Sequence, residues 1–249
     1  MNIHTIILAA GKGTRMNTNL PKVMQPLGGH TLISHVIKTA KKNSKNITVV
    51  VGHQKDLLKD HIASIDSNIQ TADQDDQLGT AHAVKTAAHL IKEDERVLVL
   101  YGDVPLISHK TIEALIESGQ ECTLLAMKLT DPTGYGRIVT NEQNLALRII
   151  EQKDASEDER KIKDVFTGIL LIDGGLLRSA LDEINNQNAA NEYYLTDLVE
   201  ILSTKGVKIN CIQADPNEVL GANNKYELHE LESILRKMSA EKLLEQGIT

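Results

Sequence analysis

Aromatic side chains are scarce in this sequence, at 2% of its 249 residues, with no tryptophan and a single phenylalanine, Phe166. The core must therefore be built from Ile, Leu, Val and Ala. Hydrophobic residues make up 41% of the chain and charged residues 24%, as in ordinary folded proteins. The composition excludes a disordered chain, and the length suits one large α/β domain or two modest ones.

An excess of basic residues is also missing, because 27 Lys and Arg face 34 Asp and Glu, for a formal net charge of −7. A protein that binds along a duplex needs a basic face to neutralise phosphates. We therefore expect no nucleic-acid partner. An acidic chain can still bind a small polyanion where a few cations converge on one pocket. Local groups of Lys and Arg therefore indicate such a site better than the net charge does.

Long hydrophobic runs and cysteine motifs are missing too. The apolar N-terminal run has no basic segment before it and ends at Gly11-Lys12, which is too short for a signal peptide or a membrane span. Cys122 and Cys211 stand alone in apolar surroundings, which is typical of reduced core thiols rather than of a disulfide or a metal site. We expect a cytoplasmic protein without a membrane partner.

Short apolar runs alternate with amphipathic stretches along the chain. The runs are continuous, which indicates strands covered on both faces, as in a mostly parallel sheet. Strand–helix alternation through residue 118 predicts βαβ units and an open, doubly wound α/β sheet. The predicted strands are residues 5–9, 47–51, 97–101, 122–127, 137–139, 166–172 and 207–212. The predicted helices are residues 32–41, 55–65, 80–91, 110–118, 176–183, 195–203 and 226–244.

The end of the chain has its own character. Residues 154–164 form the most charged stretch, which we interpret as an exposed loop or short helix. The last stretch reads as one long helix with an apolar stripe, Leu228, Leu231, Ile234, Leu235 and Met238. A helix at the end of a domain often packs on a neighbour or leads into another module. We therefore predict a domain of residues 1–222 followed by a C-terminal linker helix within 223–249.

The first predicted strand runs into a glycine-rich loop, Gly11-Lys-Gly-Thr-Arg15, and then Leu20-Pro-Lys22. Glycines let the backbone approach a phosphate closely, and Lys12, Arg15 and Lys22 place three cations beside it. The spacing fits neither a Walker A loop nor a dinucleotide fingerprint, which needs glycine where Met16 stands. From spacing alone, a phosphate site and an ordinary turn with solvated cations both remain open.

Tyr101-Gly102-Asp103 follows the predicted strand 97–101. In open α/β sheets, ligands gather at the carboxyl ends of the strands. An Asp there can hold Mg²⁺, which takes a few carboxylate oxygens and completes its shell with phosphates and water. The other interpretation is an Asp that caps the helix beginning near Ser108, and the pattern alone does not decide.

Residues 74–80 lead into the next predicted helix, and backbone amides at a helix start could bind an anion or a base edge. This signal is weak by itself, because Gly-Thr is common at helix starts. His82 and His89 lie seven residues apart on that helix, and we expect structural roles for both.

Together these segments resemble the sugar-1-phosphate nucleotidylyltransferases, which begin with a loop similar to residues 8–16 (LAAGKGTRM) and 20–22 (LPK). The order and spacing of further motifs resemble, over the whole chain, the uridylyltransferase domain of the bacterial bifunctional N-acetylglucosamine-1-phosphate uridylyltransferase / glucosamine-1-phosphate acetyltransferase family. These motifs are residues 77–80 (QLGT), 101–106 (YGDVPL), 131–137 (DPTGYGR), 151–154 (EQKD), 167–168 (TG), 192–197 (EYYLTD) and 223–224 (NN).

The resemblance implies a Rossmann-like nucleotide half joined to a smaller sugar-binding half. It implies that UTP and N-acetylglucosamine 1-phosphate react with Mg²⁺ to give pyrophosphate and UDP-N-acetylglucosamine, a precursor of peptidoglycan. The implied roles are nucleotide contact for Leu8, Ala9, Ala10 and Gly11; uracil and ribose recognition for Gln74, Gly79 and Thr80; catalysis at the triphosphate for Arg15 and Lys22; Mg²⁺ binding for Asp103 and Asn223; and substrate contact for Tyr101, Gly102, Gly136 and Glu151.

The chain departs from the family pattern at one position of the sugar half. The family has Asn-Thr-Gly, with the Asn bonded to the sugar, where this chain has Phe166-Thr167-Gly168. Phenylalanine makes no such bonds, and the loss would cost about 1–3 kcal/mol. A different sugar 1-phosphate, a weakly active nucleotide-binding module and a local core substitution with an unchanged pocket therefore remain as alternatives.

The second departure is length, because the bifunctional family continues into a left-handed β-helix acetyltransferase that forms its trimer. This chain stops where that module would begin. We expect a trimer only where the module is present, and we predict no acetyltransferase activity for these residues.

Overall fold

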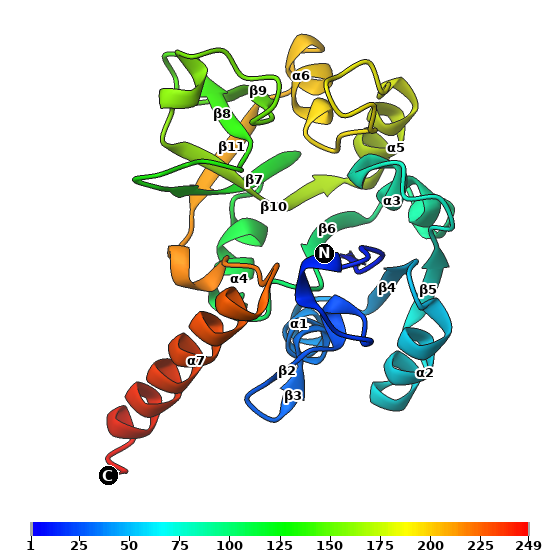
Figure 1. Cartoon of the computed structure of the whole chain (residues 1–249). Coiled ribbons are helices and arrows are strands. Elements are labelled where there is room, and N and C mark those ends of the chain that lie inside the picture. Colours follow the sequence, from blue (N-terminus) through cyan, green and yellow to red (C-terminus); the bar gives the residue numbers. More distant parts are fainter. Residues whose placement is uncertain (1, 249) are drawn as a thin grey trace.

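The computed structural model describes residues 2–248 as a three-layer α/β structure built on one nine-stranded sheet (Figure 1). Its strands are β1 (Ile3–Leu8), β4 (Asn46–Val51), β5 (Gln70–Asp73), β6 (Arg96–Tyr101), β7 (Cys122–Lys128), β8 (Arg137–Thr140), β9 (Ala146–Ile150), β10 (Asp164–Asp173) and β11 (Ile209–Gln213). A separate hairpin pairs β2 (Pro26–Leu27) with β3 (His30–Thr31). The helices are α1 (Leu32–Asn43), α2 (Lys55–Ile65), α3 (Thr80–Ala87), α4 (His109–Glu117), α5 (Gly174–Glu183), α6 (Asp197–Thr204) and α7 (Lys225–Glu245).

The strand order is β11-β7-β10-β6-β1-β4-β5, with β8 and β9 joined at the side through β10. Strand β1 pairs in parallel with β4 and β6, and β4 pairs in parallel with β5. Strand β10 runs antiparallel to both β6 and β7, so a parallel first half of the sheet is followed by a mixed second half. The doubly wound, mostly parallel sheet predicted from the sequence is confirmed.

The two faces of the sheet carry separate apolar cores, as continuous hydrophobic runs require. Along β1, Ile6 and Leu8 pack into the core covered by α3, α5 and α6, whereas Ile3 and Ile7 pack into the core covered by α1, α2 and α4. The chain builds both cores almost without aromatic rings. Phe166 belongs to the first core and is 6% exposed.

Several predicted boundaries are wrong for physical reasons. Strand β5 was missed because its sequence, QTAD, is polar and its strand lies at the sheet edge. Strand β9 was missed because only two of its five residues are buried. The predicted helix 80–91 ends at Ala87 and continues as a 3₁₀ turn over Ala88–Leu90.

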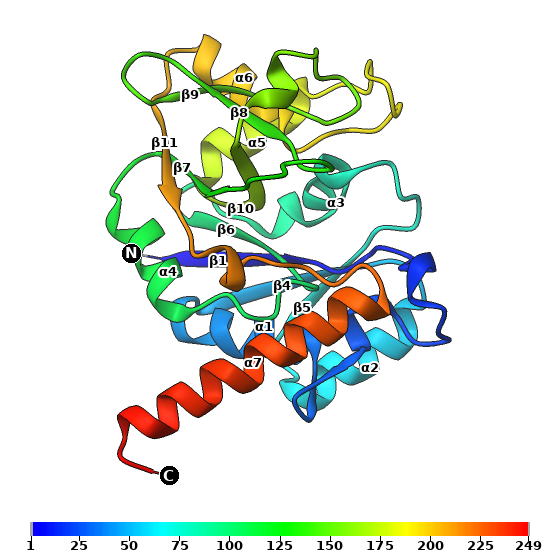
Figure 2. The same cartoon turned by 60° about the vertical axis from the view of Figure 1, so that its left-hand side comes forward.

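The C-terminal helix predicted over residues 226–244 is α7, so its bounds were predicted closely. The C-terminal part of α7 projects away from the rest of the molecule (Figures 1 and 2). Its first turns pack through Leu231 onto a small core with Met16, Leu27 and Leu106. Its far end is exposed, including Leu243 and Leu244. None of the helices within residues 2–248 has the length and apolarity that a bilayer crossing requires. Cys122 and Cys211 are free thiols, as expected.

A buried polar cluster lies at the amino end of β1, opposite the glycine-rich loop. Glu95 is 1% exposed and accepts hydrogen bonds from Asn2 Nδ2 at 2.8 Å and Asn46 Nδ2 at 2.9 Å. Its other oxygen lies 3.3 Å from Nδ1 of the buried His4. Burial alone would raise the pKa of Glu95, but hydrogen bonds from the Lys92 amide, His4 and Asn46 outweigh burial and lower it. Burial lowers the pKa of His4.

We predict that Glu95→Ala lowers the free energy of unfolding by about 3 kcal/mol, because several buried donors lose their acceptor at once. Urea unfolding at pH 7 measures the loss. The folded pKa of Glu95 is depressed, so its stabilisation is present above about pH 4.3, the unfolded carboxyl value, and is lost as the pH falls further. The difference between wild type and variant should therefore shrink in acid.

The matched control is Glu117→Ala, which removes an exposed carboxylate from α4. It should change stability by less than about 0.5 kcal/mol. Equal effects of the two substitutions would contradict a structural role for the cluster.

Candidate active site

Three parallel strands end together at one edge of the sheet, and this edge forms the base of the site. Leu8, the last residue of β1, lies in register with Val50 of β4 and Tyr101 of β6. The chain leaves β6 through Gly102, whose amide donates to the Leu8 carbonyl at 2.9 Å. A Cβ at residue 102 would lie 3.1 Å from Val23 Cγ1 and 3.3 Å from Ala9 Cβ, so glycine avoids tight contacts there.

The glycine-rich loop after β1 folds back onto Lys22. Gly13 has φ of +58°, and a Cβ at this position would lie 2.5 Å from Lys22 Cβ. Residue 13 is glycine for two reasons: its backbone is left-handed, and a side chain there would clash with Lys22. The backbone of the loop therefore lies directly against Lys22.

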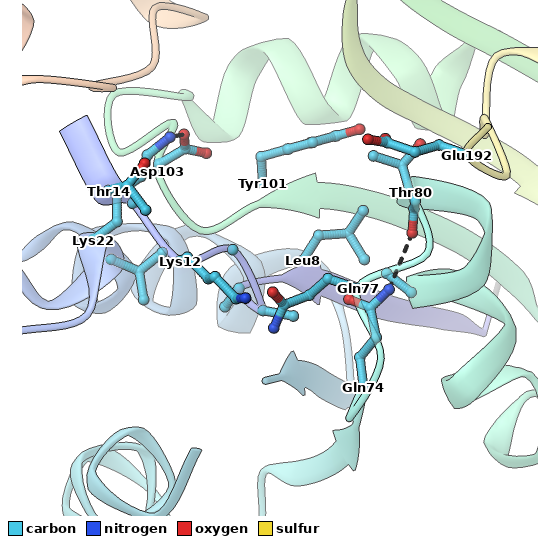
Figure 3. Close-up of a pocket in the computed structure, with 17 residues that line it drawn as sticks. Leu8, Lys12, Thr14, Lys22, Gln74, Gln77, Thr80, Tyr101, Asp103 and Glu192 are labelled. Carbon is cyan, nitrogen blue, oxygen red and sulfur yellow. Dashed lines mark hydrogen bonds and ion pairs between the residues drawn. The ribbon is translucent and has the colours of Figure 1, made fainter. Parts of the chain in front are cut away.

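A cavity of about 510 Å³ opens above this edge (Figure 3). Predicted nucleotide residues 8–11 and Gly79 line it. Gln74 and Thr80 lie at one end, and Lys22 and Asp103 lie at the other. Tyr101 also borders it. The structure thus gathers most of the predicted site residues around one hollow of the size that a nucleotide needs. The residues of this cavity that the sequence interpretation had not assigned are Lys12, Gly13, Thr14, Val23, Gln77, Ala83 and Glu192.

Lys22 lies between two oxygen-bearing side chains from distant parts of the chain. Its ammonium forms an ion pair with the Asp103 carboxylate and donates to Asn223 Oδ1 at 2.8 Å. The Ala222 amide donates to the Asp103 carbonyl at 3.3 Å, which holds the two segments together. The alternative that Asp103 caps the next helix is wrong, because the Ser108 side chain accepts from the Thr111 amide and caps α4.

Glu227 fixes the orientation of the Asn223 amide. Its carboxylate accepts from Asn223 N at 2.7 Å and from Asn223 Nδ2 at 3.0 Å, which leaves Oδ1 to face Lys22. The same carboxyl group accepts from Asn224 Nδ2 at 2.6 Å, and Asn224 in turn caps α7 by accepting from the Glu227 amide. The sequence carries the signal for this arrangement, since Asn224 and Glu227 have capping-box spacing.

Arg15 lies outside the main cavity, in a neighbouring hollow that Asp103, Tyr101 and Asn223 also line. The two hollows therefore share Asp103 and Tyr101. Burial raises the pKa of the Tyr101 phenol, so that it stays protonated and available as a donor.

The turn before α3 is hydrogen-bonded to a segment of the second half. Tyr193 N donates to the Leu78 carbonyl at 2.8 Å, and the Ala81 amide donates to the Tyr193 carbonyl at 2.9 Å. Gly79 has φ of +122°, and a Cβ there would lie 2.4 Å from the Tyr193 oxygen. Leu195 N donates to Thr80 Oγ1 at 2.9 Å. Only glycine fits at residue 79.

Of the residues that the resemblance implies for substrate contact, Tyr101 lines this cavity, whereas Gly136 and Glu151 lie beyond it. Gly136 faces the Glu151 carboxylate, which accepts a hydrogen bond from Thr196 Oγ1 at 3.1 Å. Burial raises the pKa of Glu151, and burial together with the Glu151 charge raises the pKa of Asp197 to about 6. The backbone N–H of Phe166 donates to the Gly136 carbonyl at 2.9 Å. Phe166, the residue that departs from the family pattern, therefore lies beside Gly136.

A protein-only metal centre is absent from the part of the chain that the structure describes. Across residues 2–248, no three or more His, Cys, Asp or Glu side chains are grouped so as to hold a metal ion. Asp103 and Asn223 offer a pair of oxygens instead. Such a pair suits a cation that also takes ligands from a substrate.

Comparison with protein families matches residues 5–164 to the MobA-like NTP transferase domain, which is more than half of the chain. The chain belongs to the MobA-like NTP transferase family. The geometry described above, a cavity at the carboxyl ends of parallel strands beside a glycine-rich loop, is therefore the candidate active site of an NTP transferase domain.

Two curated relatives of this NTP transferase domain are each named bifunctional protein GlmU. The protein of Hydrogenovibrio crunogenus is 44% identical over 254 residues, and that of Idiomarina loihiensis is 43% identical over 253 residues. Both matches include 100% of this chain but 56% and 55% of the relatives. The chain thus spans about half the length of the curated relatives it matches, and the resemblance predicted from the motifs is confirmed.

Solved structures support the fold. A UDP-glucose pyrophosphorylase complexed with UDP-glucose matches with a TM-score of 0.78 at 20% identity, covering 96% of this chain and 100% of that chain. A protein described as a glucose-1-phosphate thymidylyltransferase from Bacillus anthracis, in complex with a sucrose, matches with a TM-score of 0.71 at 18% identity. That match covers 94% of this chain and 95% of the other. The Rossmann-like fold class is confirmed.

Proposed function

We propose that this chain is a uridylyltransferase that makes UDP-N-acetylglucosamine and pyrophosphate from UTP and N-acetylglucosamine 1-phosphate. The observation that carries the proposal is the convergence of Asp103 and Asn223 on the Lys22 ammonium, beside the cavity floored by residues 8–11. A triphosphate needs cationic groups at such a place, and the whole-chain similarity to the GlmU proteins supports the choice of substrates. We place the reaction in the cytoplasm, in keeping with two free thiols.

We propose Mg²⁺ as the cofactor, held by Asp103 and Asn223. The donor set fits this ion, because a carboxylate and an amide oxygen from different segments already converge on one positive charge. The small number of protein ligands also fits, since Mg²⁺ usually takes the rest of its shell from phosphates and water. When bound, the ion would neutralise phosphate charge and orient the triphosphate.

The protein side chains would act mainly by position and charge. Two anions must approach each other when the sugar phosphate attacks the α-phosphorus of UTP. Arg15 and Lys22 would lower this repulsion, and the backbone of residues 10–13 would bring amide groups close to the phosphates. No general base is required, because the attacking phosphate oxygen is already ionised near neutral pH. Transfer of this kind depends on alignment rather than on a protein nucleophile.

A second candidate is uridylyl transfer to a different sugar 1-phosphate, and Phe166 favours it. Its phenyl ring is buried in the core that includes Ile149 and Leu195, next to the segment that carries Glu151. The ring brings no hydrogen-bonding group to a region where the family has an Asn. Sugar choice therefore depends on whether Gly136, Glu151 and their neighbours supply enough polar contacts.

With UTP and Mg²⁺, we predict pyrophosphate release only when a hexose 1-phosphate is added. A coupled pyrophosphate assay with the 1-phosphates of N-acetylglucosamine, glucosamine, glucose and galactose measures the preference. N-acetylglucosamine 1-phosphate should give the highest kcat/KM. A preference for another sugar would favour the second candidate, and no turnover with any of the four would refute uridylyl transfer to a hexose phosphate.

Asp103→Ala should reduce kcat/KM by at least about 100-fold, because the proposed metal site and the Lys22 ion pair both lose their carboxylate. Mn²⁺ binding in the presence of UTP, followed by electron paramagnetic resonance, should weaken in parallel. The control Asp158→Ala removes a carboxylate that is 91% exposed and should leave both measurements unchanged. If Asp103→Ala binds Mn²⁺ as tightly as the wild type does, Asp103 is not a ligand of the proposed metal site.

Phe166→Asn should lower the KM for N-acetylglucosamine 1-phosphate by about tenfold, because an amide donates and accepts hydrogen bonds where a phenyl ring does neither. The KM for UTP should stay the same. Thermal unfolding should show a loss of stability of about 2 kcal/mol or more, since the substitution leaves a cavity and a polar group in an apolar core. An unchanged KM for the sugar phosphate would identify Phe166 as a core residue alone.

A further inference from the structure

Gln74 lies at the end of the cavity where the proposed function puts the base. It is 3% exposed, and its backbone amide donates to the Val51 carbonyl at 2.8 Å, so its position is fixed by the end of β4. Its side-chain amide also lines the cavity (Figure 3). What Gln74 offers a ligand depends on which amide atom faces inward, because its oxygen only accepts and its nitrogen only donates hydrogen bonds.

The surroundings of Gln74 decide this orientation. Its side-chain nitrogen lies 3.1 Å from the Gly79 carbonyl oxygen, which can only accept, so the group facing Gly79 must be the NH₂ (Figure 3). The same nitrogen lies 3.1 Å from Nδ1 of His82, in the first turn of α3. Because that nitrogen donates, His82 Nδ1 must be the unprotonated acceptor, and the ring proton lies on Nε2.

Both N–H groups of the Gln74 amide are therefore used within the protein. Within residues 2–248 no donor reaches Gln74 Oε1, and this oxygen is not among the atoms sealed in the interior without a partner. Gln74 thus presents the cavity with an acceptor. A base that carries a ring N–H donor matches this acceptor, and a base that presents a ring nitrogen lone pair does not.

We propose that His82 is a positioning residue, which together with the Gly79 carbonyl holds the Gln74 amide with its oxygen toward the base and so selects uracil over cytosine. This inference rests on the proposed function, because it assumes that the base of a nucleoside triphosphate lies against Gln74. Uracil carries a donor at N3, whereas cytosine has an acceptor there. Against cytosine, two acceptors would face each other beside a side chain that is only 3% exposed, which costs more than one missing contact.

The same geometry predicts what His82 does not select. Thymine carries the same N3–H as uracil and differs by a methyl group that Gln74 does not contact through this edge. The orientation of Gln74 therefore separates UTP and dTTP from CTP but does not separate UTP from dTTP. A merely structural role of His82 would weaken all three nucleotides alike.

The test measures the Kd of UTP, dTTP and CTP by calorimetry with Mg²⁺ and without sugar phosphate, for the wild-type chain and its variants. Wild type should bind UTP and dTTP more tightly than CTP. His82→Ala and the bulkier His82→Leu should each narrow the UTP-to-CTP ratio by about five- to tenfold, because the Gln74 NH₂ loses one acceptor. The UTP-to-dTTP ratio should not change.

Two further variants serve as controls. His82→Asn keeps an acceptor near the position of Nδ1 and should restore most of the discrimination. His89→Ala removes an exposed histidine that follows α3 and should behave as wild type.

The outcomes separate the inference from the function on which it rests. Unchanged UTP-to-CTP ratios in His82→Ala and His82→Leu would overturn the role of His82 and leave the proposed function standing. An equal loss for all three nucleotides would also overturn it. If wild type binds none of the three nucleotides, the proposed function fails and the inference fails with it.

Discussion

The parallel pairing of β1 with both β4 and β6 is the constraint on which the candidate site depends. This pairing places Leu8, Val50 and Tyr101 side by side, so three chain segments leave the sheet at one edge. Each segment then turns into a different part of the cavity. The loop after β1 supplies backbone and cations, the chain after β6 supplies Asp103, and the last residue of β4, Val51, supports Gln74 through its carbonyl. The backbone hydrogen bonds of β1 thus set the relative positions of residues far apart in sequence.

The charge arrangement follows from this edge. Although the chain is acidic overall, it places the positive charge of Lys22 at this edge. The Lys22 ammonium bridges a carboxylate oxygen of Asp103 and the amide oxygen of Asn223. Glu227 holds the Asn223 amide in the matching orientation from the first turn of α7. The C-terminal helix therefore does more than cover apolar surface, because its capping residues orient a side chain of the candidate site.

The sequence was sufficient for the fold class and for most strands of the parallel half, because buried strands there are continuous apolar runs. Strand β5 escaped detection, since a polar edge strand has no such signal. The glycine-rich loop and Asp103 could be proposed as site residues from local pattern alone. The bridge that Lys22 makes between Asp103 and Asn223 could not, because no local rule links residues separated by more than a hundred positions. The family resemblance supplied that link.

The orientation of individual side chains is harder to predict from the sequence than the fold class is. His82 was expected to have a structural role, and nothing in its spacing indicates that its ring meets Gln74. Likewise, Phe166 was identified as unusual, but the sequence could not show that it is buried against apolar neighbours while its backbone pairs with Gly136. Contacts of this kind depend on how α3 and β10 pack, which is decided by the whole core.

The hydrogen bonds between the turn before α3 and Tyr193 join the two halves at the cavity wall. Leu78 and Ala81 are hydrogen-bonded to the backbone of Tyr193. Three residues further along, Thr196 donates a hydrogen bond to the Glu151 carboxylate. A shift of the second half that made room for a larger or smaller sugar would pull on Gly79, where no other residue fits. Under the proposed function, selection of the base and selection of the sugar would be mechanically linked, so remodelling the sugar side without disturbing the base side would require compensating changes at residues 192–196.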